Sequence, residues 1–183
     1  MTPSQGAESD DDLMTRFKGG DSAAFEVLYD RYEAHLFGLC IRLLGSRADA
    51  EDALQEAFAK VVDRRDSFRP EGRFRSWIFT IARFTCMDRL RIAKTEQRFL
   101  ERMDRSERVE THEGRALART DVNRLLMDLP ADQREVLVLH RLHGFSQSEI
   151  AEMVGSTETA VRQMAYRALK TLRAQVGETE ESE

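Results

Sequence analysis

Apolar residues recur at steps of three and four along most of the chain, which is the spacing of one face of an α-helix. One such stripe comprises Phe25, Leu28, Tyr29, Tyr32, Leu36, Leu39, Cys40 and Leu43. Asp21 or Ser22 can cap its start, and Gly45 can end it. No pair of segments alternates in the way that paired strands do. The pattern therefore predicts an all-α protein.

Two further helices follow in the first half of the chain. Ser46-Arg-Ala-Asp49 predicts a helix start, and the apolar face behind it comprises Ala50, Ala53, Leu54, Ala57, Phe58, Val61 and Val62. Pro70 and Gly72 then interrupt the pattern. The next stripe comprises Phe74, Trp77, Ile78, Ile81, Thr85 and Leu90. After residue 94 the chain mixes acids with arginines and has few apolar residues up to residue 120, so we interpret this stretch as a linker.

Helical patterning resumes with Val122, Leu125, Leu126 and Leu129. Pro130 suits the first turn of another helix, and Asp132-x-x-Glu135 resembles a capping box for it. That helix is expected to run to about His143 before Gly144.

A short helix, a glycine turn and a longer helix complete the second half. Ser146-Gln-Ser-Glu149 is a capping box, Gly155 supplies the turn, and Ser156 or Thr157 can cap the longer helix. Its inner face comprises Val161, Ala165, Ala168, Leu169 and Leu172, and its outer face comprises Arg162, Gln163, Tyr166, Arg167, Lys170 and Arg173. This pattern is typical of a DNA-binding helix-turn-helix, whose second helix enters the major groove. A solvated amphipathic hairpin is the alternative.

The charge of the chain is unevenly distributed. Among 183 residues, 33 acids face 28 bases, and the net charge is −5. Acids without nearby bases gather near both ends: Glu8, Asp10, Asp11 and Asp12, then Glu178, Glu180, Glu181 and Glu183. Without these eight, 25 acids face 28 bases, so the acidic total does not exclude nucleic acid. We expect both ends to be solvated and poorly ordered.

The composition also argues against several functional classes. No stretch approaches the roughly 20 apolar residues of a membrane span, and Met1–Asp12 does not resemble a secretory signal. Cys40 and Cys86 are isolated, which favours a reducing cytoplasm. His140-x-x-His143 lacks the further ligands that a metal site needs. We therefore predict no catalytic residues, metal or cofactor, and no enzymatic activity.

One helix face in the first half is strongly acidic. It comprises Asp49, Glu51, Asp52, Gln55 and Glu56. Acids in a first turn stabilise a helix through its dipole, which explains Asp49 and Glu51 better than Glu56. The functional alternative is a docking face for a basic partner.

The stretch from Arg64 to Lys94 has the opposite charge. Its nine bases are Arg64, Arg65, Arg69, Arg73, Arg75, Arg83, Arg89, Arg91 and Lys94, and its aromatic residues are Phe68, Phe74, Trp77, Phe79 and Phe84. Bases interleaved with rings suit single-stranded nucleic acid. Alternatively, Trp77 and Phe74 belong to the core. Phe68 and the segment 73–75 lie near Pro70 and Gly72, so we expect them to be exposed.

In order, these pieces resemble the extracytoplasmic-function (ECF, group 4) sigma factors of bacterial RNA polymerase. The motifs that carry the resemblance in the first half are Asp21-x-x-Ala24-Phe25-Glu26-x-Leu28-Tyr29-x-Arg31-Tyr32, Asp49-Ala-Glu-Asp-Ala-Leu-Gln55-Glu56-x-Phe58, Phe74-x-x-Trp77-Ile78-x-x-Ile81-Ala82-Arg83 and Asp88-Arg89-Leu90-Arg91. In the second half they are Leu129-Pro130-x-x-x-Arg134-x-Val136-Leu137, Ser146-x-x-Glu149-Ile150-Ala151 and Arg167-Ala168.

The resemblance implies a promoter-specificity subunit with two helical domains. Its segments would be an acidic N-terminus (1–10), sigma region 2 (11–94), a linker (95–120), sigma region 4 (121–177) and an acidic tail (178–183). Its partners would be core RNA polymerase, through the β′ clamp helices and the β subunit, promoter DNA, and an anti-sigma factor. A free-standing helix-turn-helix regulator is the alternative.

The resemblance also implies roles for individual residues. Asp49, Asp52, Gln55 and Glu56 would dock on polymerase. Phe68, Arg69, Arg73, Phe74, Arg75 and Arg83 would bind the melted −10 strand. Arg162, Gln163, Tyr166, Arg167 and Lys170 would bind the −35 element. The chain departs from the family pattern at Phe84, Ala160 and Met164, where the family usually has Asn, Thr and a basic residue.

Overall fold

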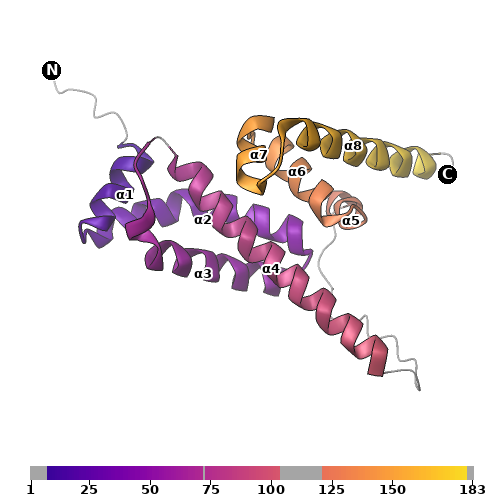
Figure 1. Cartoon of the computed structure of the whole chain (residues 1–183), viewed down its shortest axis with the longest axis horizontal. Coiled ribbons are helices and arrows are strands. Elements are labelled where there is room, and N and C mark those ends of the chain that lie inside the picture. The colour runs from indigo at the N-terminus through magenta and orange to yellow at the C-terminus, as the bar shows by residue number, and fades with distance from the viewer. Residues whose placement is uncertain (1–7, 72, 104–120, 181–183) are drawn as a thin grey trace.

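The computed structural model describes residues 8–71, 73–103 and 121–180, in which every regular element is a helix (Figure 1). The elements are α1 (Asp10–Lys18), α2 (Ser22–Leu44), α3 (Arg47–Asp63), the 3-10 turn η1 (Arg65–Ser67), α4 (Phe74–Met103), α5 (Asp121–Met127), α6 (Ala131–Arg141), α7 (Gln147–Val154) and α8 (Glu158–Glu180). The predicted all-α, two-domain fold is confirmed.

The starts and ends of the first long helices lie where the sequence predicts them. The Asp21 carboxylate accepts a hydrogen bond from the backbone N–H of Ala23 at the start of α2. Gly45 ends that helix with a φ of +71°, a conformation that glycine adopts without strain. Ser46 caps α3 by accepting from the N–H of Asp49. Local side-chain chemistry therefore sets these helix boundaries.

The N-terminal domain is built around α2, which packs against α1, α3 and α4. Its apolar stripe is buried, and Leu28, Leu36 and Leu39 are inaccessible to solvent. Opposing side chains such as Val61 of α3 and Ile78 of α4 close the core. This packing leaves the opposite faces of α3 and α4 available for other contacts.

The acids near the N-terminus lie at an ordered helix start, so the expectation that this end is poorly ordered is wrong for residues 8–12. Ser9 caps α1, and Asp10 contacts both Arg31 and Tyr32 of α2. Asp11 accepts hydrogen bonds from the backbone N–H groups of Arg73 and Phe74, where α4 begins. Carboxylates at helix N-termini satisfy unpaired N–H groups and complement the helix dipole.

Helix α4 continues beyond the predicted linker boundary at residues 94 and 95. Residues 91–100 are exposed but include Glu, Gln, Arg and Leu, which favour helix on their own. The rest of the predicted linker, 104–120, lies outside the described residues. Likewise α8 continues through Glu178 to Glu180, so the start of the predicted acidic tail is helical, and 181–183 lie outside the described residues.

The C-terminal domain contains the predicted helix-turn-helix. Ser146 and Glu149 form both hydrogen bonds of the capping box at the start of α7. Gly155 ends α7 with a φ of +65°, and Thr157 accepts from the N–H of Ala160 in the first turn of α8. Val161, Ala165 and Ala168 of α8 are buried, as predicted. The geometry of the motif is confirmed.

The second predicted capping box, at Asp132 and Glu135, does not form. Pro130 occupies the N-cap of α6, and no side chain caps this helix. Glu135 is instead buried, and its carboxylate binds Arg83 of α4. The competing interaction is stronger because it joins two charged groups away from water.

Ser146→Ala should lower the free energy of unfolding of the C-terminal domain by about 1 kcal/mol, because the N–H of Glu149 loses its cap. Chemical denaturation followed by circular dichroism measures the change. Ser148→Ala, at an exposed position two residues further along, in the first turn of the same helix, is the matched control. Equal midpoints for the two variants would contradict the role of the cap.

Candidate docking face and nucleic-acid interfaces

The acidic face of α3 is exposed along most of its length. Asp49, Asp52 and Gln55 are exposed, and Glu56 is half-buried beside α4. Arg89 of α4 contacts this face, with ion pairs of 3.1 Å to Glu56 and 3.7 Å to Asp52. The four residues that are predicted to dock on polymerase therefore lie on one surface.

Glu56 is held in its ionised form. Its carboxylate pairs with Lys60 at 2.7 Å one turn along α3. The hydrogen bond from Lys60 lowers the pKa of Glu56; partial burial opposes this effect, and Arg89 adds to it. Lys60 and Arg89 therefore fix the position of the Glu56 carboxylate, while the Asp52 side chain, which also pairs with Arg89, stays exposed to a partner.

Phe68 and Phe74 are buried, so the expectation that Phe68 is exposed is wrong. The two rings meet edge to face with centroids 5.8 Å apart, and Phe68 lies 5.2 Å from Trp77. The backbone carbonyl of Phe68 accepts a hydrogen bond from Lys18 of α1 at 2.9 Å. The segment turns back over α4 and so removes the large apolar ring of Phe68 from water. The free energy gained by this burial explains why Phe68 is buried although it lies near Pro70.

The four arginines predicted to bind the −10 strand differ in exposure. Arg69, Arg73 and Arg75 are exposed, whereas Arg83 is only 7% exposed. Arg73 also lies 3.8 Å from Glu152 of α7. With both aromatic candidates buried, the exposed part of the predicted −10 surface reduces to Arg69, Arg73 and Arg75.

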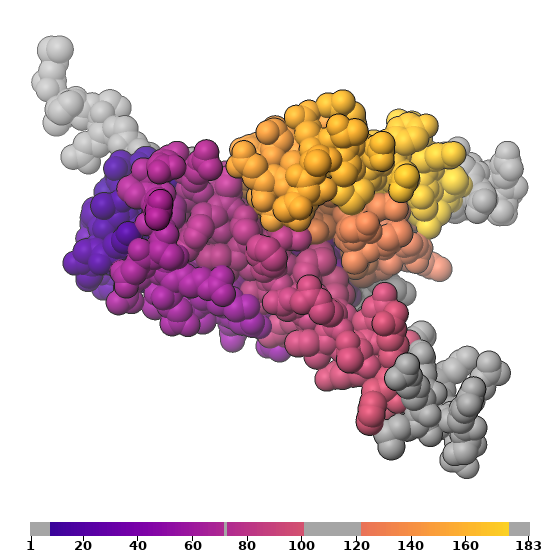
Figure 2. Space-filling view, in the orientation of Figure 1, coloured from indigo at the N-terminus to yellow at the C-terminus, as the bar shows by residue number. Residues whose placement is uncertain are grey.

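Arg83 is buried because the C-terminal domain lies against α4, as the space-filling view shows (Figure 2). Its Nε and Nη2 both donate to the Glu135 carboxylate of α6. Its Nη1 donates to the backbone carbonyl of Met153, in α7, at 3.0 Å. All three guanidinium nitrogens therefore bind the C-terminal domain.

Two residues one and two turns earlier on α4 contact the same domain. The Arg75 guanidinium lies 4.0 Å from the centroid of the Phe145 ring, and its Nη2 donates to the carbonyl of His143. Phe79 packs against the rings of Phe145 and His143, with centroids 5.0 and 4.8 Å away. Because Arg75, Phe79 and Arg83 are spaced by four, they form one stripe along α4. We refer to these three residues as the interdomain stripe.

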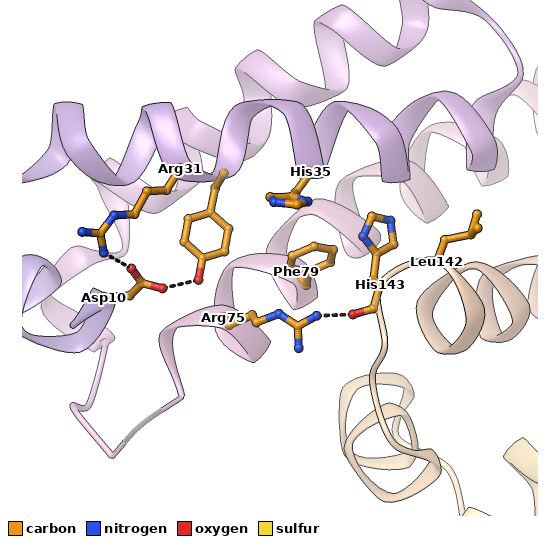
Figure 3. A pocket seen from close by; sticks show the side chains of 8 residues that line it. Asp10, Arg31, His35, Arg75, Phe79, Leu142 and His143 are labelled. Carbon is orange, nitrogen blue, oxygen red and sulfur yellow. Dashed lines mark hydrogen bonds and ion pairs between the residues drawn. The ribbon is translucent and has the colours of Figure 1, made fainter. Parts of the chain in front are cut away.

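A cavity of about 280 Å³ lies at the junction of the two domains (Figure 3). It is lined by Asp10, Arg31, Tyr32, His35, Arg75, Phe79, Leu142 and His143. Arg31 pairs with Asp10 at 2.6 Å, and the Tyr32 hydroxyl donates to the same carboxylate. Burial, followed by the positive charges of Arg42, His35 and Arg75, lowers the pKa of His143 to about 4. His143 is therefore neutral at pH 7 and part of the domain contact.

The two histidines with metal-ligand spacing take part in packing. His140 Nδ1 lies 2.8 Å from the backbone carbonyl of Phe145, and His143 contacts Phe79. Across residues 8–71, 73–103 and 121–180, no three potential ligands gather as a metal would require.

The predicted −35 surface lies on the outer face of α8, which packs through its inner face on α5, α6 and α7. Arg162, Gln163, Tyr166, Arg167 and Lys170 are all exposed. Arg162 is oriented by Glu158 at 2.8 Å and by Gln147 of α7 at 3.0 Å. The helix thus presents a basic, hydrogen-bonding face to solvent, as a groove-reading helix requires.

Two family models match the chain, Sigma-70 region 2 over residues 28–95 and Sigma-70, region 4 over residues 119–172. The ECF RNA polymerase sigma factor SigM of Mycobacterium tuberculosis is 34% identical over 174 residues, which cover 92% of this chain and 85% of SigM. The chain belongs to the ECF-type sigma factors. The region 2 match covers α3 and the first part of α4, which a free-standing helix-turn-helix regulator would not need.

Solved structures agree with this assignment. CnrH in complex with the cytosolic domain of CnrY has a TM-score of 0.72 and 26% identity, and the match covers 93% of this sigma factor and 98% of CnrH. RpoE of Bartonella quintana, in complex with the anti-sigma factor NepR, has a TM-score of 0.68 and 25% identity, with 84% and 96% covered. No helix in the described parts of this sigma factor is long and apolar enough to cross a membrane.

Sequence reasoning missed three residues that organise these surfaces. Asp11 holds the start of α4, Arg89 holds the carboxylates of α3, and Glu135 holds Arg83. Each acts on a residue at least 33 positions away, so no local spacing signals the pair. A charged residue facing the apolar side of its helix, as Glu135 does in α6, is the one available signal.

Proposed function

We propose that this ECF-type sigma factor, a member of group 4, binds core RNA polymerase and directs transcription initiation at promoters with its own −35 and −10 elements. The observation that carries the proposal is the separation of charge between domains. An exposed acidic face lies on α3, and an exposed basic face lies on α8. Such a subunit positions another enzyme and needs no catalytic activity.

The α3 face docks on the basic β′ clamp helices of polymerase, with the β subunit completing the contact. Asp49, Asp52 and Gln55 offer exposed acceptors, and Glu56 is fixed in its charged form by Lys60 and Arg89. Complementary charge accelerates association and fixes the register of docking. Arg89 is a positioning residue in this arrangement, since it holds two carboxylates of the face.

The −10 strand binds to the basic segment before and along α4. Arg69, Arg73 and Arg75 supply exposed positive charge for the phosphates. Phe68, Phe74 and Trp77 support this segment from below as a ring cluster. Arg83 becomes available to DNA only when the C-terminal domain leaves α4.

The −35 element binds to α8 in the major groove. Arg162→Ala and Arg167→Ala should each weaken binding of promoter duplex by the polymerase complex by about 1–3 kcal/mol, because each removes a potential two-bond contact to a base. Fluorescence anisotropy on promoter and scrambled duplexes measures the losses, and Arg173→Ala, further along the helix, is the control. Equal losses on both duplexes would show that these arginines contact phosphates only.

An anti-sigma factor is the expected inhibitor, since RpoE of Bartonella quintana is bound to one in its solved structure. Because its proposed partners, core polymerase and promoter DNA, are cytoplasmic, we expect this sigma factor to act in the cytoplasm. The relevant test is co-purification of the full chain with bacterial core polymerase, followed by duplex binding with and without polymerase. The proposal predicts a stable complex whose DNA affinity depends on polymerase. Tight palindromic duplex binding by the chain alone, with no complex, would overturn it.

A further inference from the structure

The segment between η1 and α4 carries two exposed arginines of the predicted −10 surface, Arg69 and Arg73. The rings on either side of them, Phe68 and Phe74, are buried in the core. Burial of the rings leaves the backbone N–H and carbonyl groups at the two ends in need of partners, since such groups are costly to leave unpaired. Helix α1 lies against both η1 and α4 (Figure 1), so it is placed to supply those partners.

Asp11 of α1 supplies them at the α4 end. Arg73 is the N-cap of α4, because its carbonyl accepts a hydrogen bond from the N–H of Trp77 at 2.9 Å. The first N–H groups of a helix have no partner within it. The Asp11 carboxylate accepts from the N–H groups of Arg73 and Phe74, at 3.3 and 3.0 Å. Hydrogen bonds to an ionised carboxylate are stronger than neutral ones, and the negative charge complements the helix dipole.

Lys18, the last residue of α1, has the corresponding role at the η1 end. Its ammonium group donates to the backbone carbonyl of Phe68 at 2.9 Å and to that of Asp66 at 3.3 Å. The last carbonyls of a helical turn lack partners within it, and a lysine side chain is suited to bind them. A cation at one end of the segment and an anion at the other therefore tie its backbone to a single helix.

The two residues lie on one face of α1. Asp11, Met14 and Lys18 are spaced by three and four, and Met14 between them is fully buried. A helix rises ~1.5 Å per residue, so the two charged residues are attached ~10 Å apart on a rigid element. Helix α1 is in turn held on α2 by Asp10, which pairs with Arg31 at 2.6 Å. Changes at Asp11 and Lys18 therefore leave this attachment of α1 in place.

We propose that Asp11 and Lys18 are positioning residues for −10 recognition, which hold the backbone on both sides of Arg69 and Arg73 so that these arginines meet the melted strand in a fixed arrangement. The inference rests on the proposed function, which assigns the two arginines to that strand. Groups held in place before binding avoid the cost of being ordered during it. The Asp11 carboxylate would repel phosphates and the Lys18 ammonium is bound to carbonyls, so both act through the segment and not by touching DNA.

The first measurement tests the anchoring in the free full-length chain. The variants are Asp11→Asn, Lys18→Met and the double variant, with Lys18→Arg as the conservative change that keeps a donor. Asp12→Asn is the matched control, because it removes the same charge in the same turn and its carboxylate accepts from the Ser9 hydroxyl. Circular dichroism and urea unfolding establish that each protein is folded. Hydrogen exchange followed by mass spectrometry measures the opening of backbone amides at residues 67–68 and 73–74.

We expect the double variant to exchange faster at both ends of the segment, with Asp12→Asn and Lys18→Arg like the wild type. The second measurement uses the complex with core polymerase and a fork-junction DNA from a promoter that the wild-type complex transcribes, with a duplex −35 element and a single-stranded −10 element. Affinity of the double variant for this DNA should fall about tenfold, the effect of losing a charge-assisted hydrogen bond at each end. Its affinity for core polymerase and for the −35 duplex should match the wild type.

A merely structural role would lower the urea midpoint and leave fork-junction affinity unchanged. Unchanged exchange in the folded double variant would overturn the inference, and so would faster exchange with wild-type affinity for the fork junction. A wild-type chain that forms no complex with core polymerase would count against the proposed function, whereas the exchange measurement on the free chain decides the anchoring independently.

Discussion

The double variant Asp52→Lys with Glu56→Lys should lose binding to core RNA polymerase by at least about 100-fold. The substitutions place two positive charges on the α3 face, where the proposed partner is itself basic, and like charges brought together cost several kcal/mol. Asp52 is the cleaner of the two positions because its side chain is 65% exposed. Titration of labelled protein with core polymerase measures the loss.

Glu56 needs a control of its own, since lysine at this position would meet Lys60 and Arg89. Asp52→Lys alone avoids the repulsion with Lys60 and leaves Arg89, 3.7 Å from the Asp52 carboxylate, as its paired neighbour on α4. Glu51→Lys tests a neighbouring acid that is not among the four residues assigned to docking. The free energy of unfolding of Asp52→Lys and of Glu51→Lys should stay within about 1 kcal/mol of wild type, as is usual for exposed positions. Undiminished polymerase binding by a folded double variant would remove the docking assignment.

Phe68→Ala should lower the free energy of unfolding of the N-terminal domain by about 3–5 kcal/mol, because it opens a cavity among Phe74, Trp77 and the rest of the core. Urea unfolding followed by circular dichroism measures the loss. Arg69→Ala changes the exposed neighbour and should leave stability nearly unchanged.

Promoter opening by variants at Phe68 and Arg69 separates two interpretations of Phe68, as a ring of the core and as a ring that contacts a base. Arg69→Ala should weaken promoter opening by the polymerase complex with no loss of stability. Phe68→Leu should retain most of both stability and opening, since it keeps an apolar side chain in the core. A Phe68→Ala protein as stable as wild type, but unable to open promoters, would restore the interpretation of Phe68 as a base-contacting ring.

Local sequence patterns were sufficient to predict most of the helices and the helix-turn-helix. The starts of α2, α3 and α7 depend on Asp21, Ser46 and Ser146, each of which bonds to a backbone N–H two or three residues away. The exposed face of α8 follows in the same way from the helical repeat. Such features depend on residues that are close together in the sequence, so they can be predicted from the sequence alone.

The features that local rules missed depend on residues far apart in the chain. Asp132 and Glu135 have the spacing of a capping box, but Glu135 binds Arg83, 52 positions earlier. The base nearest in sequence to the acid run at residues 10–12 is Arg16, which pairs with Glu8 and Asp21, whereas Asp10 meets Arg31, 21 positions later. Phe68 has the flanking residues of an exposed loop, but its burial is decided by rings on α4. In each case tertiary packing overrides a correct local pattern.

The periodicity of apolar residues also does not predict that the C-terminal domain packs against α4. Arg75, Phe79 and Arg83 have the helical spacing of a binding stripe, and the sequence favours nucleic acid as their partner. Nothing in the local pattern indicates that His143, Phe145 and Glu135 of the same chain meet them first. The choice between two partners for one surface requires the fold.

Transcription of fragmented genomic DNA by bacterial core polymerase, reconstituted with the purified full chain, tests the proposed function most directly. Sequencing of the RNA 5′ ends locates the transcription starts. We predict starts that share a common pair of upstream elements and vanish when the chain carries Asp52→Lys and Glu56→Lys. Core polymerase that starts no such transcripts with the wild-type chain, in a preparation free of any inhibitor, would contradict it.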